Sequence, residues 1–229
     1  MTDLRDLDQA RSNMIKQQIR TWVTLEEDVQ DMLSAVRREN FVPMAHKALA
    51  FADLRIPLLQ PAETALRNGQ CMLEPKVEAR MLQDLRLQGH EKVLEVGAGS
   101  GYMAALLSYR AQRVITLELN PELAAMARAN LQRAGIANVE VRNADGSRGL
   151  AADGPFDAIV LSGSVAEVPQ ALLSQLKIGG RLSAIVGFEP VMRGTLITRT
   201  GDTTYTTTQP WDTTAPRLAN FPEPSKFHF

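Results

Sequence analysis

The chain has 229 residues, of which 25 are Lys or Arg and 26 are Asp or Glu, so its formal net charge is −1. This length suits one domain with a modest extension, and the near-zero charge provides no overall attraction to nucleic acid or anionic lipid. The single cysteine, Cys71, cannot form an internal disulfide, and the histidines lie far from it and from one another. The first twenty residues lack a signal peptide's apolar core, and no run reaches the roughly 20 apolar residues of a membrane span. We therefore expect a cytoplasmic protein with no metal and no membrane partner.

The first region, residues 1–90, is predicted to be a helical and loop extension that covers a cleft. Apolar residues at helical spacing predict helices over 12–20, 25–38 and 77–87, with Thr24 as the N-cap of the second. Prolines and a glycine interrupt residues 57–75, which predicts a loop.

The second region, residues 91–208, alternates short apolar runs with helical patterns. Strands are predicted over 93–96, 114–117, 139–141, 158–161 and 182–186. A helix over 103–110 follows the first strand, and a second helix over 121–134 has Asn120 as its N-cap. This alternation indicates an α/β fold, with a parallel sheet covered by helices on both faces.

Residues 191–229 have a different periodicity from the preceding region. Two β-branched runs, 195–199 and 203–207, flank a Thr-Gly-Asp turn and predict an antiparallel hairpin. Residues 209–229 are rich in proline, which predicts an extended tail. The tail's aromatic side chains indicate that it packs on the domain or on a partner; they are Trp211, Phe221, Phe227 and Phe229.

The most informative segment is the glycine loop after the first predicted strand. Gly97, Gly99 and Gly101 stand in a Gly-x-Gly-x-Gly pattern between a strand and a helix. Glycines allow a sharp turn and a close approach of ligand to backbone, and doubly wound folds bind ligands at this end of a strand. The third glycine comes one residue earlier than in the dinucleotide fingerprint, which favours a smaller adenosyl ligand. A packing loop has the same pattern, so this motif alone leaves both interpretations open.

Two acidic residues at later strand ends strengthen the ligand interpretation. Glu118 closes the second strand, where an acid accepts hydrogen bonds from ribose hydroxyls; the alternative is a surface acid before a helix N-terminus. Asp145 follows the third strand and could face an adenine amino group, or it could form an ordinary Asp-Gly turn. Their order at successive strand ends favours the ligand site.

Together these motifs resemble class I S-adenosylmethionine-dependent methyltransferases, and in particular the protein-L-isoaspartate O-methyltransferase family. The resemblance covers most of residues 12–188. It includes the Val36–Pro43 segment, the Gly97–Tyr102 loop, the Asp145-Gly146 turn and the approach to the fifth strand at 171–182. It implies a Rossmann-like, seven-stranded, mostly parallel sheet with an antiparallel C-terminal hairpin. It also implies methylation of the carboxylate of isoaspartyl residues in damaged proteins, with S-adenosyl-L-methionine as cofactor.

The resemblance also implies a set of cofactor-binding residues at the strand ends. Glu118 would hold the ribose, and Asp145 with Gly146 the adenine. The small residues Ser162 and Ser164 after the fourth strand would face the methyl group, or would cap a helix. The full cofactor set is Glu95, Gly97, Ala98, Gly99, Ser100, Gly101, Tyr102, Glu118, Leu119, Asp145, Gly146 and Ser162.

The sequence departs from this family in the loop before the sheet. The family has Thr-Ile-Ser-Gln-Pro there, whereas this chain has Cys71-Met72-Leu73-Glu74-Pro75. Leu73 replaces the serine beside the substrate carboxylate, and Glu74 places a negative charge near an anionic acceptor. Alternatively, Leu73 packs under the sheet and Glu74 is solvated. The acceptor-side candidates are therefore Leu73, Glu74, Ser162 and Ser164, with no catalytic residue assigned.

Three hypotheses follow for the function. The first is a repair methyltransferase acting on isoaspartyl proteins or peptides. The second is a methyltransferase of the same fold with a different acceptor. The third is a cofactor-binding protein without repair activity, whose tail contacts a partner. The oligomeric state is left open.

Overall fold

A computed structural model describes residues 4–223 of the chain. Phe227 and Phe229 of the predicted tail lie outside the described residues. The α-helices are α1 (Leu4–Asn13), α2 (Glu27–Ala35), α3 (Ala62–Arg67), α4 (Pro75–Leu85), α5 (Tyr102–Ser108), α6 (Pro121–Arg133) and α7 (Gln170–Leu173). A π-helical segment, η1 (Met14–Ile19), continues α1, and the 3₁₀ helices are η2 (Arg38–Asn40), η3 (Met44–Leu49) and η4 (Ala151–Asp153). No described helix is long and apolar enough to cross a membrane.

The centre of the molecule is a seven-stranded sheet in the order β5-β4-β3-β6-β7-β8-β9. Strands β3 to β7 pair in parallel, whereas β8 runs antiparallel to both β7 and β9. The strands are β3 (Lys92–Val96), β4 (Arg113–Glu118), β5 (Val139–Asn143), β6 (Phe156–Val165), β7 (Leu176–Phe188), β8 (Val191–Arg199) and β9 (Tyr205–Thr213). The predicted fold class is confirmed. The sheet switches direction of growth at β3, and such a switch point is where doubly wound folds bind ligands.

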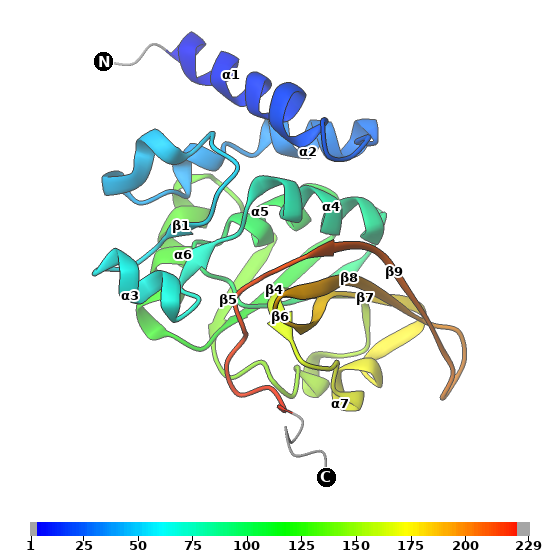
Figure 1. Cartoon of the computed structure of the whole chain (residues 1–229). Helices are drawn as coiled ribbons and strands as arrows, with labels where there is room; N and C mark the ends of the chain where they lie inside the picture. The colour runs from blue at the N-terminus through cyan, green and yellow to red at the C-terminus, as the bar shows by residue number, and fades with distance from the viewer. Residues whose placement is uncertain (1–3, 224–229) are drawn as a thin grey trace.

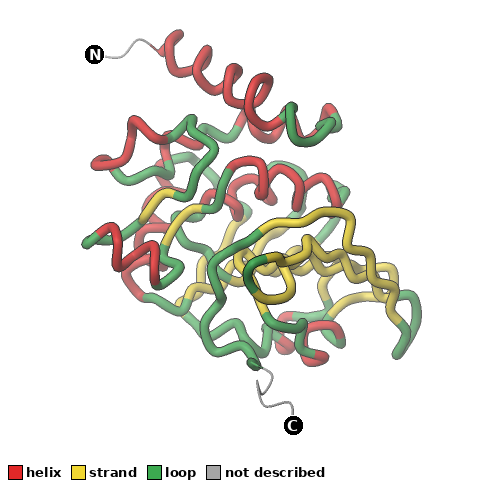
Figure 2. Tube along the Cα trace, viewed as in Figure 1, coloured by secondary structure: helices red, strands yellow, loops and turns green. Residues whose placement is uncertain are grey.

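The two faces of the sheet have separate cores, because successive strand residues point to opposite faces. On one face, Val93 and Val114 join the apolar sides of α4, α5 and α6 in a single buried cluster. On the other face, Leu94 and Ile115 join α7 and Phe221 from the chain end. Figure 2 shows the helices mainly on one side of the strands, with loop and the short α7 on the other, while α1 and α2 lie outside α4 and α5 (Figure 1).

The helix over 121–134 is confirmed as α6. The Asn120 side chain accepts hydrogen bonds from the amides of Glu122 (2.8 Å) and Leu123 (3.2 Å), so the predicted cap is present. The Thr24 cap is wrong: α2 begins at Glu27 with Glu26 at the N-cap, and no side chain caps it.

Residues 57–75 are more ordered than the predicted loop. They contain α3 between two short antiparallel strands, β1 (Ile56–Pro57) and β2 (Cys71–Met72). The residues that suggested a loop stand at element ends: Pro61 precedes α3, Gly69 follows it with φ +72°, and Pro75 begins α4. Proline and glycine here stand at the ends of helices and strands, and the sequence pattern did not distinguish such ends from a continuous loop.

The chain end is also more ordered than expected. Strand β9 continues to Thr213, so the predicted boundary at residue 208 lies inside a strand. After β9 the chain, red in Figure 1, turns back across the molecule. Phe221 is 7% exposed in the second core. The aromatic tail therefore packs on its own domain in the described part of the chain.

A buried ion pair joins η2 to α4 within the N-terminal region. Arg38 is fully buried and pairs with Glu78 of α4, while its Nη2 donates to the Leu73 carbonyl at 2.8 Å. Its guanidinium carbon lies 5.0 Å from the centre of the Tyr102 ring. Burial raises the pKa of Glu78 to about 7, although Arg38 opposes that shift.

We predict that Arg38→Met destabilises the protein by about 3–5 kcal/mol, because it leaves the buried Glu78 carboxylate without its partner. Chemical denaturation measures the free energy of unfolding. Arg37→Met is the matched control, because the Arg37 side chain is 49% exposed and lies 4.0 Å from Asp8; it should cost less than about 0.5 kcal/mol. Equal costs for the two variants would contradict the assigned role of the ion pair.

Candidate active site

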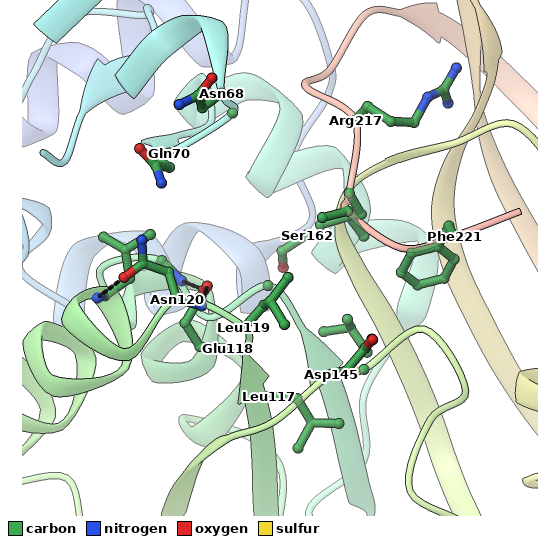
Figure 3. Close-up of a pocket in the computed structure, with 18 of the residues that line it drawn as sticks. Asn68, Gln70, Leu117, Glu118, Leu119, Asn120, Asp145, Ser162, Arg217 and Phe221 are labelled. Carbon is green, nitrogen blue, oxygen red and sulfur yellow. Dashed lines mark hydrogen bonds between the residues drawn. The ribbon is translucent and has the colours of Figure 1, made fainter. Parts of the chain in front are cut away.

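A cavity of about 340 Å³ lies at the carboxyl ends of the central strands (Figure 3). Ligand pockets are typically ~300–1,000 Å³, so this one has the size of a small-molecule site. Its walls come from the glycine loop, the ends of β4 and β6, the turn after β5, and two segments that the sequence did not assign to the site. The lining residues from those two segments are Asn68, Gly69, Gln70 and Cys71 before α4, and Arg217, Leu218, Ala219 and Phe221 near the chain end.

The glycines of the loop after β3 have different surroundings: two line the cavity, and the third packs inside the protein. Gly97 (φ +95°) and Gly99 (φ +52°) line the cavity, and both adopt left-handed backbone conformations that other residues rarely take. Gly101 is a correction to the predicted set. It faces α6, where a Cβ atom would lie 3.3 Å from Ala127, so its missing side chain permits helix packing instead of ligand contact.

Glu118, at the end of β4, holds the loop in place. Its Oε2 accepts from the Gly99 amide at 2.9 Å, and its Oε1 accepts from the Asn120 amide at 3.0 Å. The carboxylate lines the cavity while only 8% of the residue is exposed. Each oxygen keeps a lone pair for a further donor, so this carboxylate can accept from a ligand's hydroxyl groups. Its neighbour Leu119 also lines the cavity and is 46% exposed.

Asp145 and Gly146 form the cavity wall after β5. The Ser147 amide donates to the Asp145 carboxylate at 2.9 Å and holds the pKa of Asp145 below its ordinary value; Asn220, from the chain end, donates to the other oxygen at 2.9 Å. At Gly146 a Cβ atom would lie 2.4 Å from Val96, so a side chain cannot be placed there without displacing the sheet. The carboxylate is thus fixed in its charged, accepting form.

Glu95 lies beneath the cavity rather than in its wall. It is fully buried and accepts from the Ser162 hydroxyl at 2.7 Å, while its Oε2 has no partner in the described part of the chain. Burial raises the pKa of Glu95 to about 7, against the opposing effect of its hydrogen bond with Ser162. Glu95 therefore acts on a ligand only through Ser162, which does line the cavity.

Ser162 and Ser164 occupy different environments because β6 is irregular between them. The pairing of β6 with β7 shifts register between Val160 and Ser164, and such bulges redirect side chains near ligand sites. Ser162 consequently faces the cavity. Ser164 is a correction to the acceptor-side set: it is fully buried, and its hydroxyl donates to the Ala215 carbonyl at 2.8 Å, which fixes the chain end.

A second cavity, of about 30 Å³, adjoins the first and shares Cys71, Gly97, Gly99 and Ser162 with it. Its other walls include Leu73 and three of the residues predicted to bind cofactor, namely Ala98, Ser100 and Tyr102. Ser100 and Tyr102 are almost completely buried. Burial also raises the pKa of the Cys71 thiol to about 11, so at neutral pH it is protonated and a poor nucleophile.

The departing residues Leu73 and Glu74 have separate roles. Leu73 is 6% exposed and belongs to the main core, as one of the two interpretations predicted. Glu74 is neither solvated nor a free charge beside the acceptor. It pairs with Arg55, whose Nε lies 3.2 Å from Oε1, and its side chain is only 19% exposed. The sequence did not indicate this partner, because Arg55 is 19 positions away in a segment predicted as part of the covering extension.

The chain end is one of the two parts of the site that the sequence analysis missed. Ser164 forms a parallel bridge with Arg217, and the Leu218 amide donates to the Ser164 carbonyl at 2.9 Å. This pairing places Leu218 and Phe221 in the cavity wall, and Figure 3 shows Phe221 on the side of the cavity where Asp145 lies. The aromatic residues of the tail were the available signal, but they indicated packing and not its location.

The fold and the site define a doubly wound α/β protein with a nucleoside-sized pocket at the switch point of its sheet. Comparison with known proteins narrows this class. Residues 9–210 match the family model described as protein-L-isoaspartate(D-aspartate) O-methyltransferase.

Relatives and solved structures agree with that match. A protein-L-isoaspartate O-methyltransferase 1 of Syntrophobacter fumaroxidans is 40% identical over 78% of this chain and 79% of its own length. A protein-L-isoaspartate O-methyltransferase 2 of Marinobacter nauticus is 39% identical over 89% of this chain and 90% of its own. A Plasmodium falciparum structure, assigned to this family and solved in complex with S-adenosyl-L-homocysteine, has the same fold, with a TM-score of 0.73 at 18% identity over 92% of this chain and 98% of that one.

The chain therefore belongs to the protein-L-isoaspartate O-methyltransferase family, as the sequence motifs predicted. The family match ends at residue 210, so the segment 217–221 that lines the cavity lies beyond it.

We predict that the free energy of unfolding decreases less between pH 5 and pH 8 in Glu95→Gln than in the wild type. The folded-state pKa of about 7 exceeds the ordinary value near 4.3, so the folded protein binds the proton more tightly. This contribution is present below about pH 4.3 and is lost as the pH rises through 7. Chemical denaturation at each pH gives the free energy of unfolding, and hence its slope against pH. Glu78 retains its own contribution, so the slope should decrease rather than vanish; an unchanged slope would show that Glu95 does not titrate there.

Proposed function

We propose that this protein transfers a methyl group from S-adenosyl-L-methionine to the carboxylate of isoaspartyl residues in damaged proteins. The observation that carries the proposal is the pair of adjoining cavities. The larger is lined by Glu118 and Asp145 at successive strand ends, and the smaller meets it at Ser162. This arrangement offers one space for a nucleoside and a neighbouring space for the group being transferred. Membership of the family supports the same activity.

The residues of the larger cavity fit the adenosyl cofactor. Glu118 has an accepting carboxylate for the two ribose hydroxyls, and Asp145 has one for the adenine amino group. Gly97 and Gly99 leave space at the loop where a Cβ atom would approach Leu218 or Leu58 within 3.1–3.3 Å. We assign the remaining cofactor contacts to Leu119, Gly146 and Ser162, which line the same cavity.

When bound, S-adenosyl-L-methionine supplies an electrophilic methyl group on a positively charged sulfur. A carboxylate acceptor has an ordinary pKa near 4, so it is already ionised at pH 7 and needs no general base. The protein therefore does not have to supply a general base. Consistent with this, Cys71 is protonated and Glu95 is buried, so neither side chain can act as a base at the surface. The protein's own task is to align the acceptor with the methyl group and to exclude water.

The proposal also assigns a role to each region of the chain, a class of partner and a location in the cell. Residues 1–90 cover the cleft, the sheet region from residue 91 to the end of β9 at Thr213 holds the cofactor, and residues 217–221 close one wall. The partner is a protein or peptide rather than nucleic acid, since the net charge of −1 gives no bulk attraction to phosphates. The cytoplasm is the proposed location, because the single cysteine permits no internal disulfide.

Two measurements test the function. Isothermal titration with S-adenosyl-L-homocysteine should show binding, and methyl transfer should occur to an isoaspartyl peptide but not to the same peptide with normal aspartate. Binding with transfer to another acceptor would favour a changed substrate. Binding without transfer would favour a cofactor-binding protein, and absence of binding up to millimolar concentration would reject the proposal.

We predict that Glu118→Ala weakens S-adenosyl-L-homocysteine binding by about 10- to 100-fold, because the ribose hydroxyls lose a charged acceptor. Isothermal titration gives the dissociation constant. Glu122→Ala, an exposed acid in the first turn of α6, is the control and should retain wild-type affinity. The thermal midpoint of each variant separates loss of affinity from unfolding, and unchanged affinity in Glu118→Ala would exclude this residue from the cofactor site.

We also predict that Phe221→Ala weakens binding of the same ligand by about 10-fold, since the cavity loses an aromatic wall. Tyr109→Ala, on a surface away from both cavities and 48% exposed, is the comparison. Equal affinity in the two variants would show that the chain end covers the cavity without contacting the ligand.

A further inference from the structure

The acceptor side of the site lacks an obvious partner for a carboxylate. Leu73 stands where the resembled family has serine, and it is buried in the core. Among the described residues that line the two cavities, Arg217 is the only Lys or Arg. Its Nη2 donates to the Gly187 carbonyl at 2.9 Å, and its Nε lies 2.9 Å from Glu223, so its charge is engaged elsewhere. An anionic group entering a partly enclosed cleft without a donor pays a large desolvation cost.

We propose that Arg55 binds the acceptor carboxylate and that Glu74 neutralises Arg55 in the substrate-free protein. This inference rests on the proposed function, because it assigns the recognition of that function's substrate. It assigns to Arg55 and Glu74 a charged contact with the acceptor in place of the hydrogen bond that a serine would supply.

The first argument is position. Strands β1 and β2 pair Ile56 with Met72 and Pro57 with Cys71, so Arg55 immediately precedes the strand that pairs with Cys71, although its own side chain lines neither cavity. Cys71 lines both cavities, and the positive charge of Arg55 lowers the pKa of its thiol, against the larger raising effect of burial. The guanidinium thus acts electrostatically on the place where the two cavities meet.

The second argument is the geometry of the guanidinium. Its Nε faces both Glu74 oxygens, at 3.2 and 3.3 Å, and its Nη2 donates to the Thr214 carbonyl at 2.7 Å and to the Thr214 hydroxyl at 3.1 Å. Strong arginine–carboxylate pairs use two parallel N–H groups on two nitrogens, whereas Glu74 is held by one. Nη1 has no hydrogen-bond partner among residues 4–223. The arginine therefore retains the two N–H groups of Nη1 for a second carboxylate.

The third argument is exposure and charge. The Arg55 side chain is 29% exposed, so a substrate can reach it, and Glu74 is 19% exposed. A partly desolvated pair is less screened than a surface pair. Glu74 keeps Arg55 from standing as an isolated charge, but its own charge repels an incoming carboxylate. Removing the two partners should consequently have opposite effects on substrate binding.

The test measures methyl transfer to an isoaspartyl peptide by the full chain at saturating S-adenosyl-L-methionine. Arg55→Gln should raise KM for the peptide by about 10- to 100-fold, as expected for loss of a charged hydrogen bond. Arg55→Lys should recover part of this loss, and Glu74→Gln should lower KM. The dissociation constant for S-adenosyl-L-homocysteine should remain at the wild-type value in all three variants.

Arg80→Gln is the matched control. Arg80 pairs with Asp84 at 3.2 Å and is 28% exposed, so it resembles Arg55 in pairing and exposure, but it is not among the charges that act on Cys71. Its KM should equal that of the wild type. If Arg55 only fastened the chain end through Thr214, Arg55→Gln would weaken S-adenosyl-L-homocysteine binding and leave KM for the peptide unchanged.

The outcomes separate this inference from the proposed function. Selective methylation of the isoaspartyl peptide by the wild type, with an unchanged KM in Arg55→Gln, would overturn the role of Arg55 and leave the function standing. A wild-type protein that binds S-adenosyl-L-homocysteine but neither binds nor methylates the peptide would overturn both.

Discussion

The site depends on one residue, Glu118, which joins the three turns that surround the larger cavity. Its carboxylate holds the glycine loop through Gly99 and the start of α6 through the Asn120 amide. Its backbone carbonyl accepts from the Ala144 amide at 3.0 Å and from the Asn143 side chain at 2.8 Å, which fixes the turn that carries Asp145. A ligand that bonds to this carboxylate is therefore placed relative to all three turns at once, which is the preorganisation that methyl transfer requires.

The loop of residues 71–75 is held by charge pairs rather than by glycine turns. Arg38, Glu78 and the Leu73 carbonyl join the covering region to α4 beneath the smaller cavity. Arg55, Glu74 and Thr214 join the same loop to the chain end. The two groups fix the loop from opposite neighbours, so Leu73 can be apolar without the loop losing its place.

Local patterns in the sequence predicted the parts of the fold that depend on near neighbours. The strand before the glycine loop and the α6 cap by Asn120 are set within a few residues, and both were predicted. The sequence did not reveal that Gly101 faces Ala127 or that Ser164 holds Ala215, because those contacts depend on packing between distant segments. The same limit applies to the pairs Arg55–Glu74 and Asn220–Asp145, since ion pairs and side-chain hydrogen bonds leave no periodic signal.

The parallel bridge between Ser164 and Arg217 has a consequence for biosynthesis. It makes the last described segment of the chain a wall of a cavity whose other walls come from residues 68–162. While the chain is being made, its earlier segments can form their strands and turns, but that cavity stays open on one side until residues 217–221 have left the ribosome. The cavity wall made by residues 217–221 is thereby added after the strands and turns that form its other walls.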